Sequence, residues 1–199
     1  MKKSTSKNIA SKVIDLKIYA LKNLKKSINK DFDKAVNTIV ECRSKIILCG
    51  VGKSGLIAAK IASTLSSVGS PAFSLSANDC LHGDLGSITK KDVLILISNS
   101  GKSEEIIPII KFANRNKIKL IGIVSKKKSF LYKASDIKIL LPEVKESGLG
   151  FVPTSSTSIQ LAVGDALAVA SLKKKQFSKY DFSRLHPGGS LGRQLKTVG

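Results

Sequence analysis

The 199-residue sequence has no tryptophan, one methionine, 5% aromatic residues and three cysteines. Cys42, Cys49 and Cys80 form no CxxC pair and are odd in number, so neither a disulfide framework nor a zinc ribbon is indicated. No apolar run approaches the roughly 20 residues that span a bilayer, and no apolar segment follows the N-terminal lysines as a signal peptide requires. These absences favour a cytoplasmic protein.

Acidic residues are also scarce. The 14 Asp and Glu residues stand against 34 Lys and Arg, which gives a net charge of +20 and favours anionic partners such as nucleic acid or acidic lipid. Only Arg43, Arg115, Arg184 and Arg193 carry the guanidinium fork that recognises phosphates and base edges in a bidentate manner. The lysine runs lack interleaved aromatic residues. We therefore interpret the excess charge as a solvated surface and expect neither a specific nucleic-acid partner nor a membrane partner.

The residues that are abundant indicate one folded domain. Hydrophobic residues make up 42% of the chain, and from residue 8 to about 41 they recur at helical spacing, which predicts one or two amphipathic helices. Apolar segments typical of buried strands follow at 45–50, 71–75, 92–101, 118–125 and 136–143, with helical patterns between them and at 154–175.

Alternating strands and helices of this kind predict an α/β fold, a three-layer sandwich around a five-stranded parallel sheet. We divide the chain into an N-terminal helical segment, 1–44, and the sheet-containing domain, 45–199. In such sheets ligands bind beyond the carboxyl ends of the strands. We expect the glycine-rich tail that begins at residue 183 to be an arm and not a core element.

The segment LCGVGKSGLIAAK places Gly50, Gly52 and Gly55 between a strand and a helix. A P-loop requires a further glycine five residues before Gly52, and Ile47 stands there. The three glycines do satisfy G-x-G-x-x-G, but the next strand offers no acidic residue for the ribose hydroxyls of a dinucleotide. The segment therefore favours neither a nucleoside triphosphate nor a dinucleotide.

A second polar loop, SNSGKSEE at 98–105, follows another buried strand. It brings Ser98, Ser100 and Ser103 to the start of a helix, where backbone N–H groups and hydroxyl donors suit a compact phosphate monoester. Helix capping is the alternative interpretation, and it accounts for one serine readily and for three poorly. We predict that this loop and GVGKSG open onto one crevice that holds a phosphate.

Six motifs in order resemble the sugar isomerase (SIS) domain, specifically that of the arabinose 5-phosphate isomerases that supply Kdo and lipopolysaccharide synthesis. The motifs are GVGKSG, LHGDLG, SNSGKSEE, VPTSST, GDALAVA and HPGGSLGR, and the similarity runs from about residue 10 to 196. Longer members continue into a pair of CBS domains, which this sequence does not contain. The resemblance implies the SIS fold, no cofactor, and a homotetramer whose active sites are shared between subunits.

The resemblance also assigns site residues. The positions that it implies for catalysis are Lys53, Glu105, Glu146 and His186. The positions that it implies for binding the substrate and its phosphate are Ser54, His82, Ser98, Asn99, Ser100, Ser103, Thr154, Ser155, Ser156 and Thr157.

These residue types suit the chemistry. Moving a carbonyl between C2 and C1 of a pentose phosphate requires a base for a carbon-bound proton, a proton shuttle for the hydroxyls and a donor for the enediolate. Glu, His and Lys provide these roles, and which glutamate is the base stays open. Taken alone, Glu105 could cap a helix, and Glu146 and Lys53 could be surface charges. His82, His186 and Cys80 are too scattered to predict a metal site.

The expected function is the reversible interconversion of D-ribulose 5-phosphate and D-arabinose 5-phosphate through an enediol. Two alternatives remain. One is another SIS aldose–ketose isomerase, acting on a hexulose or heptose phosphate. The other is a non-catalytic SIS module that senses a sugar phosphate, which would keep the serine shell but tolerate loss of the Glu and His groups.

Overall fold

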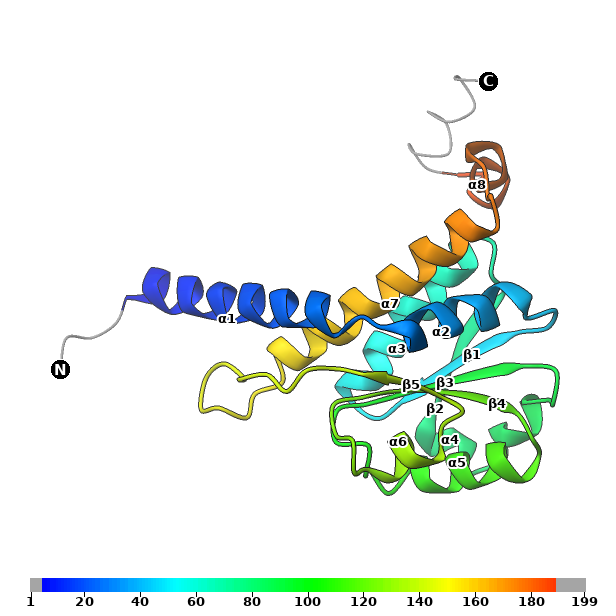
Figure 1. Cartoon of the computed structure of the whole chain (residues 1–199), viewed down its shortest axis with the longest axis horizontal. Coiled ribbons are helices and arrows are strands. Elements are labelled where there is room, and N and C mark those ends of the chain that lie inside the picture. The colour runs from blue at the N-terminus through cyan, green and yellow to red at the C-terminus, as the bar shows by residue number, and fades with distance from the viewer. Residues whose placement is uncertain (1–4, 189–199) are drawn as a thin grey trace.

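The computed structural model describes residues 5–188 and contains one five-stranded sheet (Figure 1). Its strands are β1 (Ile46–Gly50), β2 (Ala72–Ser76), β3 (Val93–Ser98), β4 (Lys119–Val124) and β5 (Ile137–Leu140). They lie in the order β2-β1-β3-β4-β5, and all neighbours pair in parallel. The predicted parallel sheet is confirmed.

Helices cover both faces of the sheet and complete the three layers (Figure 1). On one face lie α1 (Ser6–Ser27), α2 (Lys30–Glu41), α3 (Lys53–Ser67) and α7 (Ser155–Lys174). On the other lie α4 (Ala77–Cys80), α5 (Ile106–Arg115) and α6 (Phe130–Ala134). A 3₁₀ turn, η1 (Asp84–Ser87), precedes β3, and α8 (Lys179–Leu185) follows α7. The sequence patterns did not predict α4, η1 or α8, which are too short to show helical periodicity.

The central strands read as continuous apolar runs because both of their faces are buried. In β1, Ile46 and Leu48 pack into the core under α3 and α7, whereas Ile47 and Cys49 pack into the core under α5. Every residue of β1 and β3 is buried. This two-sided burial fixes the sheet as the middle layer.

The strand order creates a switch point between β1 and β3. From β1 the chain moves outward to β2 and then returns to place β3 on the opposite side of β1. Crevices that bind ligands in open parallel sheets lie at the carboxyl ends of such strands. The loops that leave β1 and β3 are GVGKSG and SNSGKS, so the fold brings the two predicted polar loops to this point.

Helices α3 and α7 pack closely side by side, and contacts along their length show that they run in the same direction. Ser54 hydrogen-bonds Gln160 near their N-terminal ends, and Lys60 forms a 2.6 Å ion pair with Asp165 further along. Gly164 permits the close approach, because a Cβ there would lie 2.2 Å from the buried Ile61 side chain. Both helices therefore begin at the carboxyl edge of the sheet.

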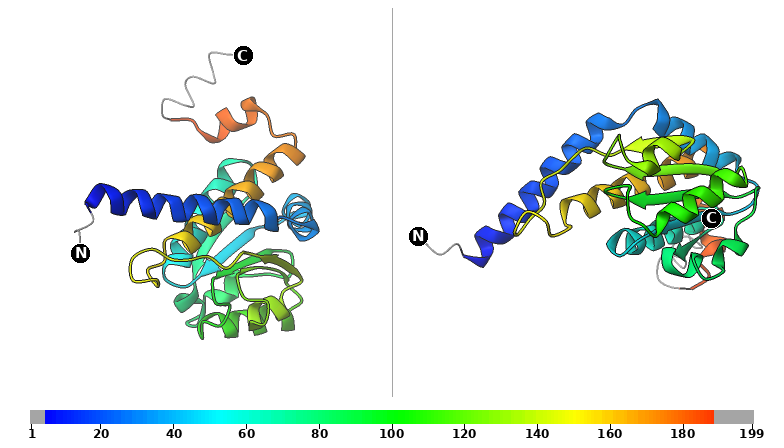
Figure 2. Two further views of the ribbon diagram at one scale, coloured as in Figure 1. Left: turned by 60° about the vertical axis from the view of Figure 1, so that its left-hand side comes forward. Right: turned by 90° about the horizontal axis from the view of Figure 1, so that it is seen from below.

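Helix α1 extends beyond the rest of the chain (Figures 1 and 2). Ala20 and Leu24 of its second half belong to the main core, but Ile14, Ile18 and Tyr19 are exposed. No helix within residues 5–188 combines the length and apolarity that crossing a bilayer requires. Most of the predicted C-terminal arm lies outside the described residues, and its start forms the end of α8.

Candidate active site

The turn from β1 to α3 owes its shape to the three glycines. A Cβ on Gly50 would lie 2.8 Å from the Ser54 carbonyl carbon, and one on Gly55 would lie 2.7 Å from the Gly50 oxygen. Gly52 has a φ of +55°, which favours glycine. The G-x-G-x-x-G pattern thus has a packing role: it lets the strand end and the helix start touch. As a result Lys53 and Ser54 form the first turn of α3.

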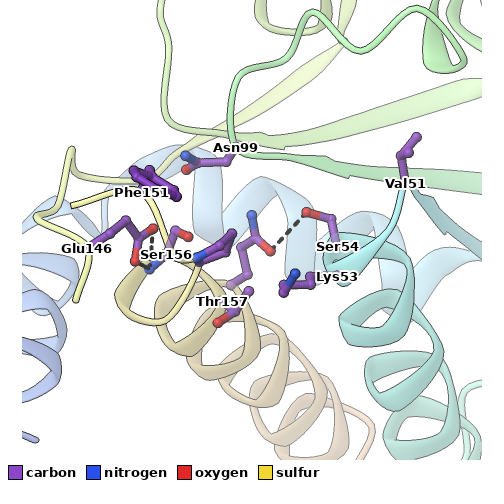
Figure 3. A pocket seen from close by; sticks show the side chains of 10 residues that line it. Val51, Lys53, Ser54, Asn99, Glu146, Phe151, Ser156 and Thr157 are labelled. Carbon is purple, nitrogen blue, oxygen red and sulfur yellow. Dashed lines mark hydrogen bonds between the residues drawn. The ribbon is translucent and has the colours of Figure 1, made fainter. Parts of the chain in front are cut away.

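A cavity of about 410 Å³ lies at this point, between the starts of α3 and α7 (Figure 3). Three segments that are remote in sequence contribute to it: the β1–α3 turn, the end of β3, and the segment from Glu146 into α7. Its lining residues are Val51, Lys53, Ser54, Asn99, Glu146, Phe151, Pro153, Ser156, Thr157 and Gln160. Six of the fourteen residues predicted for the site line this cavity.

Glu146 reaches the cavity because the loop before α7 doubles back. Ser147 and Val152 form an antiparallel bridge, and Gly148 and Gly150 between them have φ values of +66° and +86°. The loop thereby brings Glu146 to the start of α7, nine residues later in the sequence.

The Glu146 carboxylate closes the N-terminus of α7 (Figure 3). Its Oε2 accepts hydrogen bonds from the backbone N–H groups of Thr154 and Ser155, both at 2.8 Å, and from the Thr154 hydroxyl at 3.1 Å. Its Oε1 accepts from the Ser156 N–H at 3.3 Å. The first N–H groups of a helix lack intrahelical partners and carry partial positive charge. Glu146 satisfies them from outside the helix.

This arrangement keeps Glu146 ionised. Burial by itself would raise the pKa of the carboxyl group, but the hydrogen bonds from Ser156, Thr154 and Ser155 outweigh it and hold the pKa below its ordinary value. At neutral pH the cavity therefore contains a carboxylate, and the Lys53 side chain is also in its lining.

Two further side chains are fixed by hydrogen bonds across the cavity wall. Asn99 Oδ1 accepts from the Ser125 hydroxyl at 2.7 Å, which ties the end of β3 to the end of β4. Gln160 Oε1 accepts from the Ser54 hydroxyl at 3.2 Å. Sequence reasoning missed both Ser125 and Gln160. The signal for Gln160 was its spacing, because it lies three and four residues after Thr157 and Ser156 and so shares their helix face.

The serines of the β3–α5 loop are engaged within the loop itself. Ser98 Oγ accepts from the Gly101 N–H at 3.0 Å and lies 3.5 Å from Ser103 Oγ. Ser100 Oγ accepts from the Lys102 N–H at 3.3 Å. Of the five predicted residues in this loop, only Asn99 lines the 410 Å³ cavity.

Ser100 instead borders a second cavity of about 470 Å³, which is rich in lysine. Its remaining lining residues are Lys102, Lys126, Lys127, Lys128, Ser129 and Glu143.

Glu105 and the two predicted histidines lie away from the 410 Å³ cavity of their own chain. Glu105 stands at the start of α5, and its side chain makes no capping hydrogen bond within the described part of the chain. His82 is exposed, in the turn after α4. His186 ends α8, where its ring stacks on Phe182 at 3.8 Å and its Nδ1 lies 2.8 Å from the Phe182 carbonyl oxygen.

Helix α7 is roughly 30 Å long, at 1.5 Å of rise per residue, and α8, which His186 follows, lies beyond its far end from the cavity (Figure 1). Within residues 5–188, no three His, Cys, Asp or Glu side chains gather closely enough to hold a metal ion.

The arrangement of strands, glycine turn and paired helix starts matches a known family. The SIS domain model matches residues 39–170. The chain belongs to the SIS domain family. Among curated proteins, it is 45% identical over 184 residues to the arabinose 5-phosphate isomerase KdsD of Yersinia pestis, covering 92% of this chain and 56% of that protein.

Two further comparisons agree with this membership. The chain is 45% identical over 192 residues to KdsD of Francisella tularensis, covering 94% of this chain and 59% of that protein. It thus spans little more than half the length of the curated relatives it matches. A protein of E. coli CFT073, solved in complex with arabinose 5-phosphate, is 33% identical with a TM-score of 0.83, over 92% of this SIS chain and all of that one.

Proposed function

We propose that this SIS chain is an aldose–ketose isomerase that interconverts D-ribulose 5-phosphate and D-arabinose 5-phosphate through an enediol. The cavity at the β1–β3 switch point carries the proposal, because it gathers Lys53, Glu146 and amide and hydroxyl donors in a volume suited to a small sugar phosphate. The identity to KdsD proteins and the arabinose 5-phosphate complex of the E. coli relative support the choice of pentose. The product would supply Kdo and lipopolysaccharide synthesis in the cytoplasm.

In this proposal Glu146 is the base that takes the carbon-bound proton. Among residues 5–188 it is the one carboxylate in the lining of the cavity, and its lowered pKa keeps it in the ionised form that a base needs. Lys53 would stabilise the negative charge that develops on the enediolate oxygens. Ser98, Ser100 and Ser103, with the N–H groups at the start of α5, would hold the phosphate beside Asn99.

His186 would act in the site of a neighbouring subunit. It is not in the lining of the cavity of its own chain, and α8, which it follows, comes after the far end of the roughly 30 Å long α7. The exposed apolar side chains of α1 provide a surface on which subunits can associate, and exposed patches of this kind commonly mark such contacts. We propose a homotetramer with shared sites.

Incubation with ribulose 5-phosphate, followed by identification of the aldose formed, tests the reaction. Arabinose 5-phosphate is the expected product. A hexulose or heptose phosphate that turns over in its place would assign the chain to another SIS isomerase. Absence of turnover with all of these ketose phosphates would favour a sensor.

The assignment of the base is tested by Glu146→Gln. It should lower turnover at saturating substrate while substrate binding persists. Turnover near that of the wild type would move the role to Glu105. In contrast, Ser98→Ala and Ser100→Ala should mainly weaken substrate binding, since each removes a hydrogen bond to a charged phosphate, about 1.5–3 kcal/mol.

Subunit sharing is tested by complementation. Lys53→Ala and His186→Ala chains, each inactive alone, should regain activity after mixing and subunit exchange, because some sites then combine both native residues. Lys53→Ala mixed with Glu146→Gln is the matched control, since both residues line the same cavity and no site becomes complete. Mass spectrometry checks that subunits have exchanged in the mixture of Lys53→Ala and His186→Ala chains. If exchange has occurred and the mixture stays inactive, the active sites are not shared between subunits.

A further inference from the structure

Gln160 is the polar residue of the cavity that neither the sequence motifs nor the proposed chemistry uses. It lies on α7, one helical turn beyond Ser156, and its side chain is 1% exposed. A glutamine amide is seldom buried unless its donors and acceptor have partners. In the cavity wall, both the oxygen and the NH₂ group of the Gln160 amide are therefore expected to have hydrogen-bond partners.

One of these partners is present in the chain. The Ser54 hydroxyl donates to Gln160 Oε1 at 3.2 Å, as the dashed line that ends at Ser54 shows (Figure 3). This bond uses the acceptor of the amide and fixes which edge of the side chain turns to Ser54. The two N–H donors of Nε2 form no hydrogen bond to any other residue among 5–188.

We propose that Gln160 Nε2 donates a hydrogen bond to an oxygen on the sugar chain of the bound phosphosugar and thereby helps to select and orient that substrate. The inference rests on the proposed function and adds a specificity residue to it. An amide N–H donates to a hydroxyl or carbonyl oxygen. Because the Ser54 hydroxyl already holds the oxygen of the Gln160 amide, the side chain loses little conformational freedom when its N–H binds the ligand.

The geometry also indicates which part of the ligand Gln160 meets. Glu146 occupies the N–H groups at the start of α7, so that helix end does not receive the phosphate. The loop after β3 contributes Asn99 to the cavity lining, and it carries the serine hydroxyls and leads into the start of α5. With the phosphate on that side, the polyol chain points toward α7 and Gln160.

Calorimetric titration with two ligands separates sugar recognition from phosphate binding. The first ligand is the tightest binder among non-reacting pentitol and hexitol phosphates, and the second is inorganic phosphate. Gln160→Met keeps the length of the side chain but removes the amide, so it should weaken polyol phosphate binding about tenfold, about 1.4 kcal/mol, and change phosphate binding less than about twofold. Ser171→Ala, a buried polar residue later on α7, is the control and should change neither affinity.

A second variant guards against a folding defect in the first. Gln160→Leu also lacks an N–H donor and adds no charge to the cavity, so it should show the same selective loss. Polyol phosphate affinity equal to that of the wild type in a folded variant overturns the proposal. Equal weakening of both ligands also overturns it, because Gln160 would then act through Ser54 alone.

Failure of the proposed function has a different signature. The unmodified chain would bind no polyol phosphate more tightly than inorganic phosphate. In that case there is no sugar contact for Gln160 to make, and the inference is overturned together with the function. Selective binding of a hexitol phosphate would revise the substrate but leave the Gln160 comparison intact.

Discussion

Replacement of Glu146 by glutamine should destabilise the fold in a manner that depends on pH. The carboxylate accepts four hydrogen bonds at the start of α7, three from backbone N–H groups and one from the Thr154 hydroxyl. Loss of a capping side chain costs about 0.5–2 kcal/mol, and loss of a partly buried charge at a helix N-terminus costs up to about 2 kcal/mol. Glutamine keeps one oxygen acceptor, so we expect about 1–2 kcal/mol at pH 7.

The direction of the pH dependence follows from the lowered pKa. A carboxyl group with a folded-state pKa below its unfolded value, about 4.3, stabilises the fold above that unfolded value. The stabilisation disappears as the pH falls through the folded-state pKa, because the wild-type side chain is then neutral as well. The difference in unfolding free energy between wild type and Glu146→Gln should therefore be constant from pH 7 to about 5 and shrink in more acid solution.

Urea unfolding at one protein concentration measures this difference. With a slope of about 2 kcal/mol per molar urea, the midpoint should shift by about 0.5–1 M at pH 7. Glu143→Gln is the matched control. That carboxylate is 70% exposed and pairs with Lys126 at 2.8 Å on the surface, so its loss should cost well under about 1 kcal/mol. The capping role would be refuted if the difference in unfolding free energy between wild type and Glu146→Gln stayed the same down to the most acid pH at which folding is reversible.

Three further predictions concern packing, thiols and charge. Gly164→Ala should lower the free energy of unfolding in urea by about 1–3 kcal/mol, because its Cβ overpacks the α3–α7 contact. Adding Ile61→Val should recover part of this loss. If the effects of the two substitutions simply add, the contact between residues 164 and 61 is contradicted. In the native protein Ellman's reagent should titrate only the half-buried Cys42 quickly, since Cys49 and Cys80 are buried. The adjacent Cys80 thiol and burial also raise the pKa of Cys49. Rapid reaction of all three thiols would show that this core opens readily. Random duplex DNA should be retained only weakly at about 150 mM salt, with affinity falling steeply as salt rises, and tight retention there would favour a nucleic-acid function.

The alternation of apolar segments determined much of the fold. Strands buried on both faces consist of consecutive apolar residues, and helices that cover them show a 3.6-residue pattern, so the five strands and the long helices were predictable from sequence. The glycines of GVGKSG and the hydroxyl residues at the start of α7 also marked where the site lies. Both signals are local, since they depend on a few neighbouring residues.

Tertiary structure alone decided which side chains share the cavity. The contact of Glu146 with the start of α7 depends on a loop that doubles back at Gly148 and Gly150. The contact of Ser54 with Gln160 spans 106 residues and depends on how closely α3 packs against α7 at Gly164.

No local pattern encodes the distance between segments that are remote in the chain, because that distance results from packing of the whole core. The sequence therefore identified the family and the polar loops. The three-dimensional packing placed Gln160 in the cavity and left His186 at the end of α8, outside the cavity lining.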